Sequence, residues 1–192
     1  LEIRNFVKSF CKNVTAVNDV SLHLQRGVVG LIGHNGAGKT TLMQMIATLC
    51  KPSSGQILFQ GHDIVKQPKL IQQRLGFLPQ DFGVYPNVRA LEFMHYFAAL
   101  KGVNDPKRIR HLLEMVNLHD HANRIASSFS GGMRRRLGIA QALLNDPDIL
   151  IVDEPTAGLD PEERLRFRNL LGELGYKKLV IMSTHIVSDV ES

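Results

Sequence analysis

The sequence predicts an α/β fold with a mostly parallel core sheet, on three observations. First, short apolar runs typical of buried strands alternate with segments of helical periodicity. Second, a glycine-rich loop separates one of these runs from the helix expected after it. Third, partly alternating segments near the start predict a separate antiparallel sheet. The apolar runs cover residues 28–32, 75–78, 148–152 and 178–182, and the alternating segments cover 1–6, 20–24 and 56–59.

The glycine-rich loop, residues 33–40, reads Gly-His-Asn-Gly-Ala-Gly-Lys-Thr and follows the phosphate-binding pattern G-x-x-x-x-G-K-[ST]. The apolar run at 28–32 comes directly before it. Residues 41–49 follow with apolar positions on one helix face, and we expect Pro52 to end that helix. Strand, loop and helix in this order predict a P-loop NTPase core.

Each residue type in this loop has a physical role in holding phosphate. Gly33, Gly36 and Gly38 allow backbone angles that a side chain would forbid, so that successive N–H groups turn toward one anion. The helix that follows points its positive end at the same anion. Lys39 can reach the outer phosphates, and Thr40 offers a hydroxyl to Mg²⁺.

The composition fits one soluble domain of 192 residues. No signal peptide is visible, and the longest apolar runs are far shorter than the ~20 residues that cross a bilayer. Cys11 and Cys50 have no metal-type spacing, which predicts two free thiols in a reducing cytosol.

Basic residues concentrate in one segment, residues 101–136, which carries the excess behind the net charge of +5. Such a segment can contact nucleic acid, acidic lipid or an acidic partner. A nucleic-acid-binding surface often has aromatic residues among its basic ones, but the consecutive arginines at 134–136 have none among them. We therefore favour a solvated helical face and expect no nucleic-acid partner.

Two carboxylates, Asp153 and Glu154, end the apolar run at 149–152. Successive strand residues point to opposite sides, so the two acids are expected to have different roles. One can hold Mg²⁺, and the other can polarise a water that attacks the γ-phosphate.

A second anion site is possible at Ser130-Gly131-Gly132, which opens a helix. Ser130 is a good N-cap, and the glycines leave backbone N–H groups accessible. For this tripeptide alone, a simple helix cap explains the pattern better than a ligand site.

With these motifs in order, the sequence resembles the nucleotide-binding domain of ATP-binding cassette (ABC) transporters over essentially its whole length. Residues 33–41 resemble the Walker A motif, Gln80 the Q-loop glutamine and 129–133 the family signature. Asp153-Glu154 resembles the end of Walker B, 157–160 the D-loop, and His185 the H-loop histidine.

The resemblance implies ATP and Mg²⁺ as ligands. It places the phosphates on Gly33, Asn35, Gly36, Ala37, Gly38, Lys39, Thr40 and Thr41. It assigns Mg²⁺ to Thr40, Gln80 and Asp153. Glu154 would be the general base, and His185 would contact the γ-phosphate. Taken alone, Gln80 and His185 would be assigned as surface polar residues, so their roles depend on the resemblance.

The resemblance also implies a head-to-tail dimer with ATP at its interface. Ser130, Gly131 and Gly132 would reach the γ-phosphate bound to the second subunit, and Asp160 would couple the two sites. Phe10 stands where the family usually has an adenine-stacking tyrosine, with Val17 beside it. Core packing explains both residues as an alternative, and for Val17 at least as well. Met133 replaces the usual signature glutamine at helix position N3.

The resulting expectation is a single ATPase domain over 1–192, with a helical subdomain at about 87–145 and a truncated C-terminal end. It would power a separate transmembrane subunit from the cytoplasmic face, and residues 81–87 resemble export-type cassettes. One alternative is a translation-associated or other cytosolic cassette ATPase. A DNA-repair cassette is disfavoured because no heptads lie between Lys39 and Ser130, and a GTPase because no N-K-x-D motif occurs.

Overall fold

The computed structural model describes residues 1–10 and 14–186. An antiparallel sheet lies on one side of the molecule, with strand order β2-β1-β4-β5. Its strands are longer than the alternating segments indicated, because β1 and β2 pair along most of their length. They are β1 (Glu2–Phe10), β2 (Val14–His23), β4 (Ser54–Phe59) and β5 (His62–Asp63).

The second sheet is parallel and has the order β3-β8-β7-β6. Because the strands run the same way, their carboxyl ends meet at one edge, where ligands bind in open α/β sheets. The α/β prediction is therefore confirmed. The strands are β3 (Gly27–Ile32), β6 (Leu75–Leu78), β7 (Ile149–Val152) and β8 (Leu179–Thr184).

The prediction that residues 28–32 form a buried strand is only half right. They lie in β3, but β3 pairs only with β8 among the described strands, so it is an edge strand. Val28 is 38% exposed and Ile32 is 50% exposed. An apolar run shows that a strand packs on a core, but it does not show whether a second strand covers its edge.

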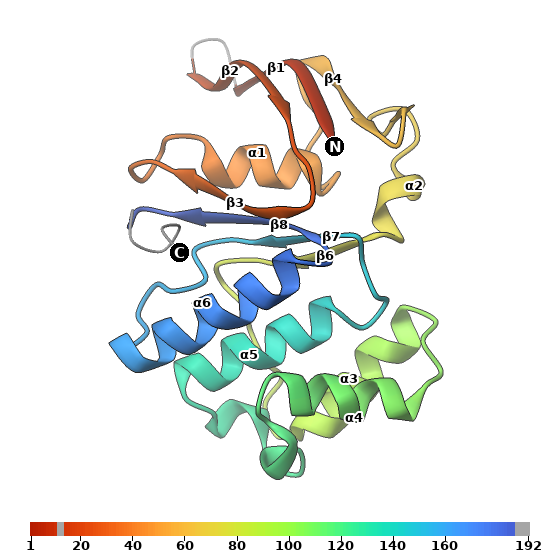
Figure 1. Cartoon of the computed structure of the whole chain (residues 1–192), viewed down its shortest axis with the longest axis vertical. Helices are drawn as coiled ribbons and strands as arrows, with labels where there is room; N and C mark the ends of the chain where they lie inside the picture. Colours follow the sequence, from red (N-terminus) through yellow and green to blue (C-terminus); the bar gives the residue numbers. More distant parts are fainter. Residues whose placement is uncertain (11–13, 187–192) are drawn as a thin grey trace.

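Helix α1 (Lys39–Ile46) lies between the two sheets, as Figure 1 shows. Its buried face joins Leu42, Met43, Met45 and Ile46 to the inner faces of both sheets in one hydrophobic cluster. The helix ends earlier than predicted, at Ile46, and Thr48 then takes a left-handed φ of 61°. Leu49 is consequently exposed, and Pro52 does not set the end of the helix.

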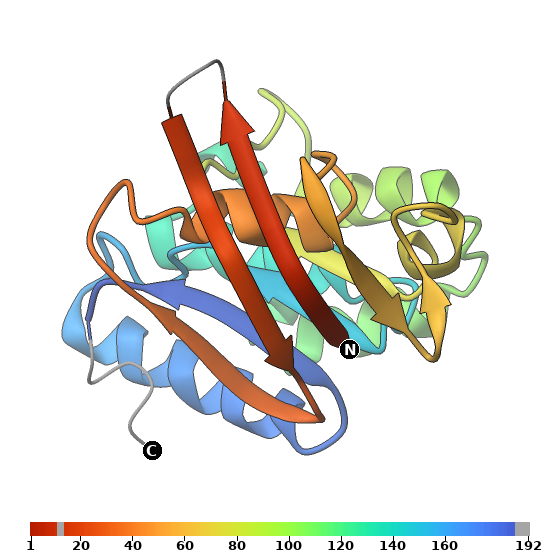
Figure 2. The ribbon, with the colours of Figure 1, turned by 90° about the horizontal axis from the view of Figure 1, so that it is seen from above.

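The opposite face of the parallel sheet carries the remaining large helices. Alternate residues of β7 face two hydrophobic clusters, one on each face of the parallel sheet. Leu150 and Val152 pack in the cluster with α3 to α6, and Ile149 and Ile151 pack in the cluster with α1. Seen from above, the antiparallel sheet crosses over the parallel one (Figure 2). The remaining helices are α2 (Lys69–Gln72), α3 (Ala90–Leu100), α4 (Pro106–Met115), α5 (Gly131–Ala142) and α6 (Pro161–Gly175), with 3₁₀ turns at His119–His121 and Ala126–Ser128.

The segment at 101–136 is only partly the solvated basic face that we favoured, because Lys107, Arg110 and Arg124 are exposed but its other lysines and arginines are not. Arg134, Arg135 and Arg136 each donate to backbone carbonyls, and Arg136 is only 9% exposed. The guanidinium of Arg108 donates to the carbonyl of Leu143. Guanidinium groups offer several donors each, so these residues satisfy carbonyls that neighbouring elements leave open.

Lys101 also donates to open backbone carbonyls, at the C-terminal end of α5. Its ammonium donates to the carbonyls of Gln141 and Ala142 and to the side chain of Asn145. Burial lowers the pKa of Lys101 to about 8. A cation at a helix C-terminus is favourable, so Lys101 caps the end of α5.

Cys50 is a free thiol, and Cys11 lies outside the described residues. Within the described part of the chain, no helix is both long enough and apolar enough to cross a membrane.

Candidate functional site

The P-loop connects the carboxyl end of β3 to the first turn of α1, where the backbone requires glycine. Gly38 is the N-cap of α1 with a φ of 87°, and Gly36 has a φ of 85°. A Cβ on Gly38 would lie 2.0 Å from the carbonyl oxygen of Ala16. Gly33 differs from our expectation because its φ is not positive, and a Cβ there would instead crowd Ala37 at 3.1 Å.

The side chain of Lys39 folds back over the loop that precedes it. Its Nζ donates to the carbonyls of Gly33 at 2.6 Å and His34 at 3.1 Å. The side chain is 9% exposed, so the loop carbonyls replace most of its water. A phosphate in the loop would offer this buried ammonium a stronger, charged acceptor.

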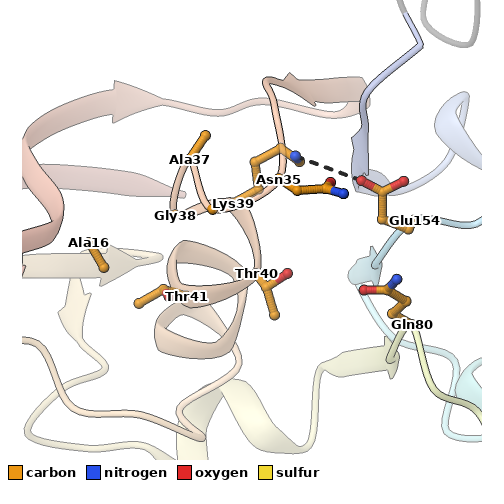
Figure 3. Close-up of a pocket in the computed structure, with 10 residues that line it drawn as sticks. Ala16, Asn35, Ala37, Gly38, Lys39, Thr40, Thr41, Gln80 and Glu154 are labelled. Carbon is orange, nitrogen blue, oxygen red and sulfur yellow. Dashed lines mark ion pairs between the residues drawn. The ribbon is translucent and has the colours of Figure 1, made fainter. Parts of the chain in front are cut away.

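A hollow of about 270 Å³ lies against this loop. Figure 3 shows Gln80 and Glu154 on the side of the hollow opposite Lys39 and Thr40. These residues come from elements far apart in the chain, and the carboxyl edge of the parallel sheet brings them together. The lining residues are Ala16, Asn35, Gly36, Ala37, Gly38, Lys39, Thr40, Thr41, Gln80 and Glu154.

Glu154 is the only carboxylate among these lining residues. One oxygen lies 3.7 Å from the ammonium of Lys39, and the other accepts a hydrogen bond of 2.8 Å from the ring Nδ1 of His185. The Glu154 side chain is 9% exposed, whereas that of His185 is 50% exposed. A buried carboxylate fixed by a histidine and facing a phosphate-binding loop can accept a proton from water.

Asp153 and Glu154 do point to different places, but for a reason other than strand alternation. β7 ends at Val152, and Glu154 has a left-handed φ of 46°. Asp153 does not line the hollow, and its carboxylate accepts a hydrogen bond of 2.6 Å from the hydroxyl of Ser183. An apolar run followed by two acids gave no sign that the strand would stop before them.

The predicted Mg²⁺ set is only partly assembled. Thr40 and Gln80 line the hollow, whereas Asp153 does not. No cluster of three His, Cys, Asp or Glu side chains that could hold a metal occurs among the described residues. Mg²⁺ is usually bound by few protein ligands together with substrate phosphates and waters, so a hydroxyl and an amide oxygen beside a phosphate loop fit it.

The second predicted anion site does not join the first within one chain. Ser130 caps α5 by accepting a hydrogen bond of 3.1 Å from the backbone N–H of Met133, which confirms Met133 at position N3. Ser130 and Gly131 are exposed, and neither they nor Gly132 line the hollow. This N-terminus therefore remains available to a ligand held elsewhere.

The remaining predicted residues lie outside the hollow. Asp160 caps α6 by accepting a hydrogen bond from the backbone N–H of Glu163. Val17 is 5% exposed and packs in the core, which agrees with the alternative assignment. Phe10 ends β1 and is 43% exposed, with the ammonium of Lys8 at 4.9 Å from its ring centroid.

Ala16 lines the hollow, and we did not predict it. Its carbonyl lies against Gly38, and only the three-dimensional fold brings β2 to that position. A small residue in a strand has no chemical signature, so nothing in its own sequence context distinguishes it.

Comparison with known proteins agrees with this geometry. The family model described as ABC transporter matches residues 17–157. The chain belongs to the ABC transporter family. It is 43% identical to the ABC transporter ATP-binding protein NatA of Bacillus subtilis, over 94% of this chain and 76% of NatA. It is also 39% identical to a Nod factor export ATP-binding protein I of Cupriavidus pinatubonensis, over 100% of this chain and 60% of that protein.

Solved structures show the same ABC fold. The dimeric structure of the bacterial ABC transporter cassette MJ0796 has a TM-score of 0.87 and 27% identity, covering 99% of this chain and 90% of that one. Its post-hydrolysis state with ADP and Pi gives a TM-score of 0.86 at 28% identity, over 98% of this chain and 89% of that one. The chain is thus an ABC ATP-binding domain, of the ATPase class. It spans 24% to 76% of the length of its similar curated relatives.

Proposed function

We propose that this domain hydrolyses ATP at the interface of a head-to-tail pair and so drives a separate transmembrane transport subunit. The observation that carries the proposal is one hollow with Lys39 on one wall and the Glu154 carboxylate on the other. The hollow would hold the triphosphate, with the glycine loop and the N-terminus of α1 against the phosphates.

The proposed reaction uses four side chains that line the hollow, together with His185, which contacts Glu154. Lys39 exchanges its bonds with the loop carbonyls for bonds to the outer phosphates. Thr40 and Gln80 would hold Mg²⁺, which would supply positive charge against the phosphates. Glu154 accepts the proton of the attacking water, and His185 fixes the carboxylate and reaches toward the γ-phosphate.

The second half of the proposed site comes from a partner domain. Ser130 and Gly131 are exposed at the N-terminus of α5, away from the hollow, and Gly132 is buried next to them. This N-terminus would therefore serve a phosphate bound by another copy or another cassette. The dimeric cassette among the structural relatives supports this arrangement. Asp160, at the start of α6, lies on the loop that would connect the two sites.

Transport as the outcome rests on the relatives, which include a Nod factor export ATP-binding protein and a linearmycin resistance ATP-binding protein. We propose an export-type transporter, with this domain at the cytoplasmic face of the membrane.

Purifying the tagged protein from its native host in mild detergent tests this proposal. We expect it to sediment with membranes and to bring a polytopic membrane protein with it, and the Lys39→Ala variant, which keeps the fold, to do the same. Recovery with ribosomes and without any membrane protein would instead support the translation-associated alternative and contradict transport.

A further inference from the structure

The peptide groups of Glu154 are held on both sides by side chains from other elements. Its N–H donates to the hydroxyl of Ser183 at 2.7 Å, and that hydroxyl donates to Asp153. Its carbonyl accepts a hydrogen bond of 2.8 Å from Nη1 of Arg135. Ser183 belongs to β8 and Arg135 to α5, so two elements converge on one residue.

This residue needs such support because its backbone is strained. Glu154 has a φ of 46°, a left-handed conformation that costs a non-glycine residue free energy. Such a conformation persists only where the surroundings fix it. The hydrogen bonds on both sides of the residue supply that constraint.

Arg135 donates hydrogen bonds to both ends of the turn from Glu154 to Ala157. Its Nη2 donates to the carbonyl of Ala157 at 3.1 Å, while the Ala157 N–H donates to the Glu154 carbonyl at 3.3 Å. One guanidinium therefore closes the turn from Glu154 to Ala157 at both ends. Burial lowers the pKa of Arg135, with the charges of Glu154 and Asp81 acting in the opposite direction, and the group still remains a cation.

The location of Arg135 connects two parts of the proposed mechanism. It lies one turn inside α5, whose N-terminus carries Ser130 and Gly131. The turn that it closes begins at Glu154 and leads toward Asp160 at the start of α6. Arg135 therefore connects α5, whose N-terminus would face the partner's nucleotide, to Glu154, the proposed general base in the hollow of the same chain.

We propose that Arg135 is a positioning residue for hydrolysis, which fixes the backbone of Glu154 and so aims its carboxylate into the hollow. The inference rests on the proposed role of Glu154. Arg135 does not line the hollow, so ATP binding should not depend on it.

The test compares Arg135→Ala with Arg108→Ala in the whole protein. Arg108 is a matched control because it also donates to a backbone carbonyl, that of Leu143 at the C-cap of α5, and its ion pair is with Asp146 and not with a residue of the Glu154 turn. We expect both variants to lose a similar amount of thermal stability. Only Arg135→Ala should lower kcat, by roughly ten- to a hundredfold, as expected for a displaced catalytic group, with KM for ATP unchanged. If Arg135→Ala does not fold, Arg135→Gln, which keeps one donor, should show a smaller fall in kcat.

A double-mutant cycle separates this role from a purely structural one. In a Glu154→Gln background, removal of Arg135 should cause no further loss of rate, and the ATP-dependent dimer should persist. A kcat equal to that of Arg108→Ala, an additive loss in the cycle, or loss of the dimer would each overturn the inference. A fast Glu154→Gln variant would instead overturn the proposed function itself.

Discussion

Replacing Glu154 with glutamine should slow ATP hydrolysis by about 10²- to 10⁴-fold, the usual contribution of a general base. Glutamine has nearly the same shape and can still accept a hydrogen bond from His185, so the fold and the hollow should be preserved. ATP should bind at least as tightly, because the substitution removes a negative charge 3.7 Å from the Lys39 ammonium.

Steady-state phosphate release measures the rate. Uncleaved ATP should also hold two domains together, and size-exclusion chromatography in ATP buffer without Mg²⁺ detects that dimer. Glu162→Gln is the control, since the Glu162 side chain is 75% exposed on α6 and pairs with Arg166. A Glu154→Gln protein that turns over ATP at the wild-type rate would show that Glu154 is not the base.

The second large effect is expected from Lys39→Ala. The variant removes an ammonium that is 9% exposed and already aimed at the phosphate loop. Charge-assisted hydrogen bonds contribute about 1.5–3 kcal/mol each, so ATP affinity should fall roughly ten- to a hundredfold, and turnover should fall with it.

Titration with a fluorescent ATP analogue measures this affinity. Lys66→Ala is the control, because Lys66 is 76% exposed and pairs with Asp63 away from the hollow. Equal affinity and full turnover in Lys39→Ala would contradict the assignment of the hollow as the triphosphate site.

The phosphate-binding loop and Glu154 could be predicted from the sequence, because their chemistry depends on short motifs at the ends of predicted strands, whereas Gln80 could be predicted only through the family resemblance. Lys39, Gln80 and Glu154 are far apart in the chain, yet each follows a strand of the parallel sheet closely. The carboxyl ends of parallel strands share one edge, so strand order alone brings these side chains together.

What the sequence could not predict depends on contacts between elements. Three consecutive arginines at 134–136 favoured an exposed face, but the helix that carries them is packed on several sides and leaves carbonyls for them to satisfy. The exposure of β3 depends on its having a single partner strand among the described residues. The left-handed backbone of Glu154 depends on Arg135 and Ser183, which no local pattern connects to it.

The most direct test of the account is to mix two inactive proteins, Lys39→Ala and Ser130→Arg, in equal amounts with ATP. If ATP lies between the loop at 33–40 of one subunit and Ser130 of the other, a mixed dimer has one site with both faces intact. Random pairing makes about half of the dimers mixed, so activity should return to at most about a quarter of the wild-type value. Dimers that form with ATP but stay inactive at every mixing ratio would contradict the shared site.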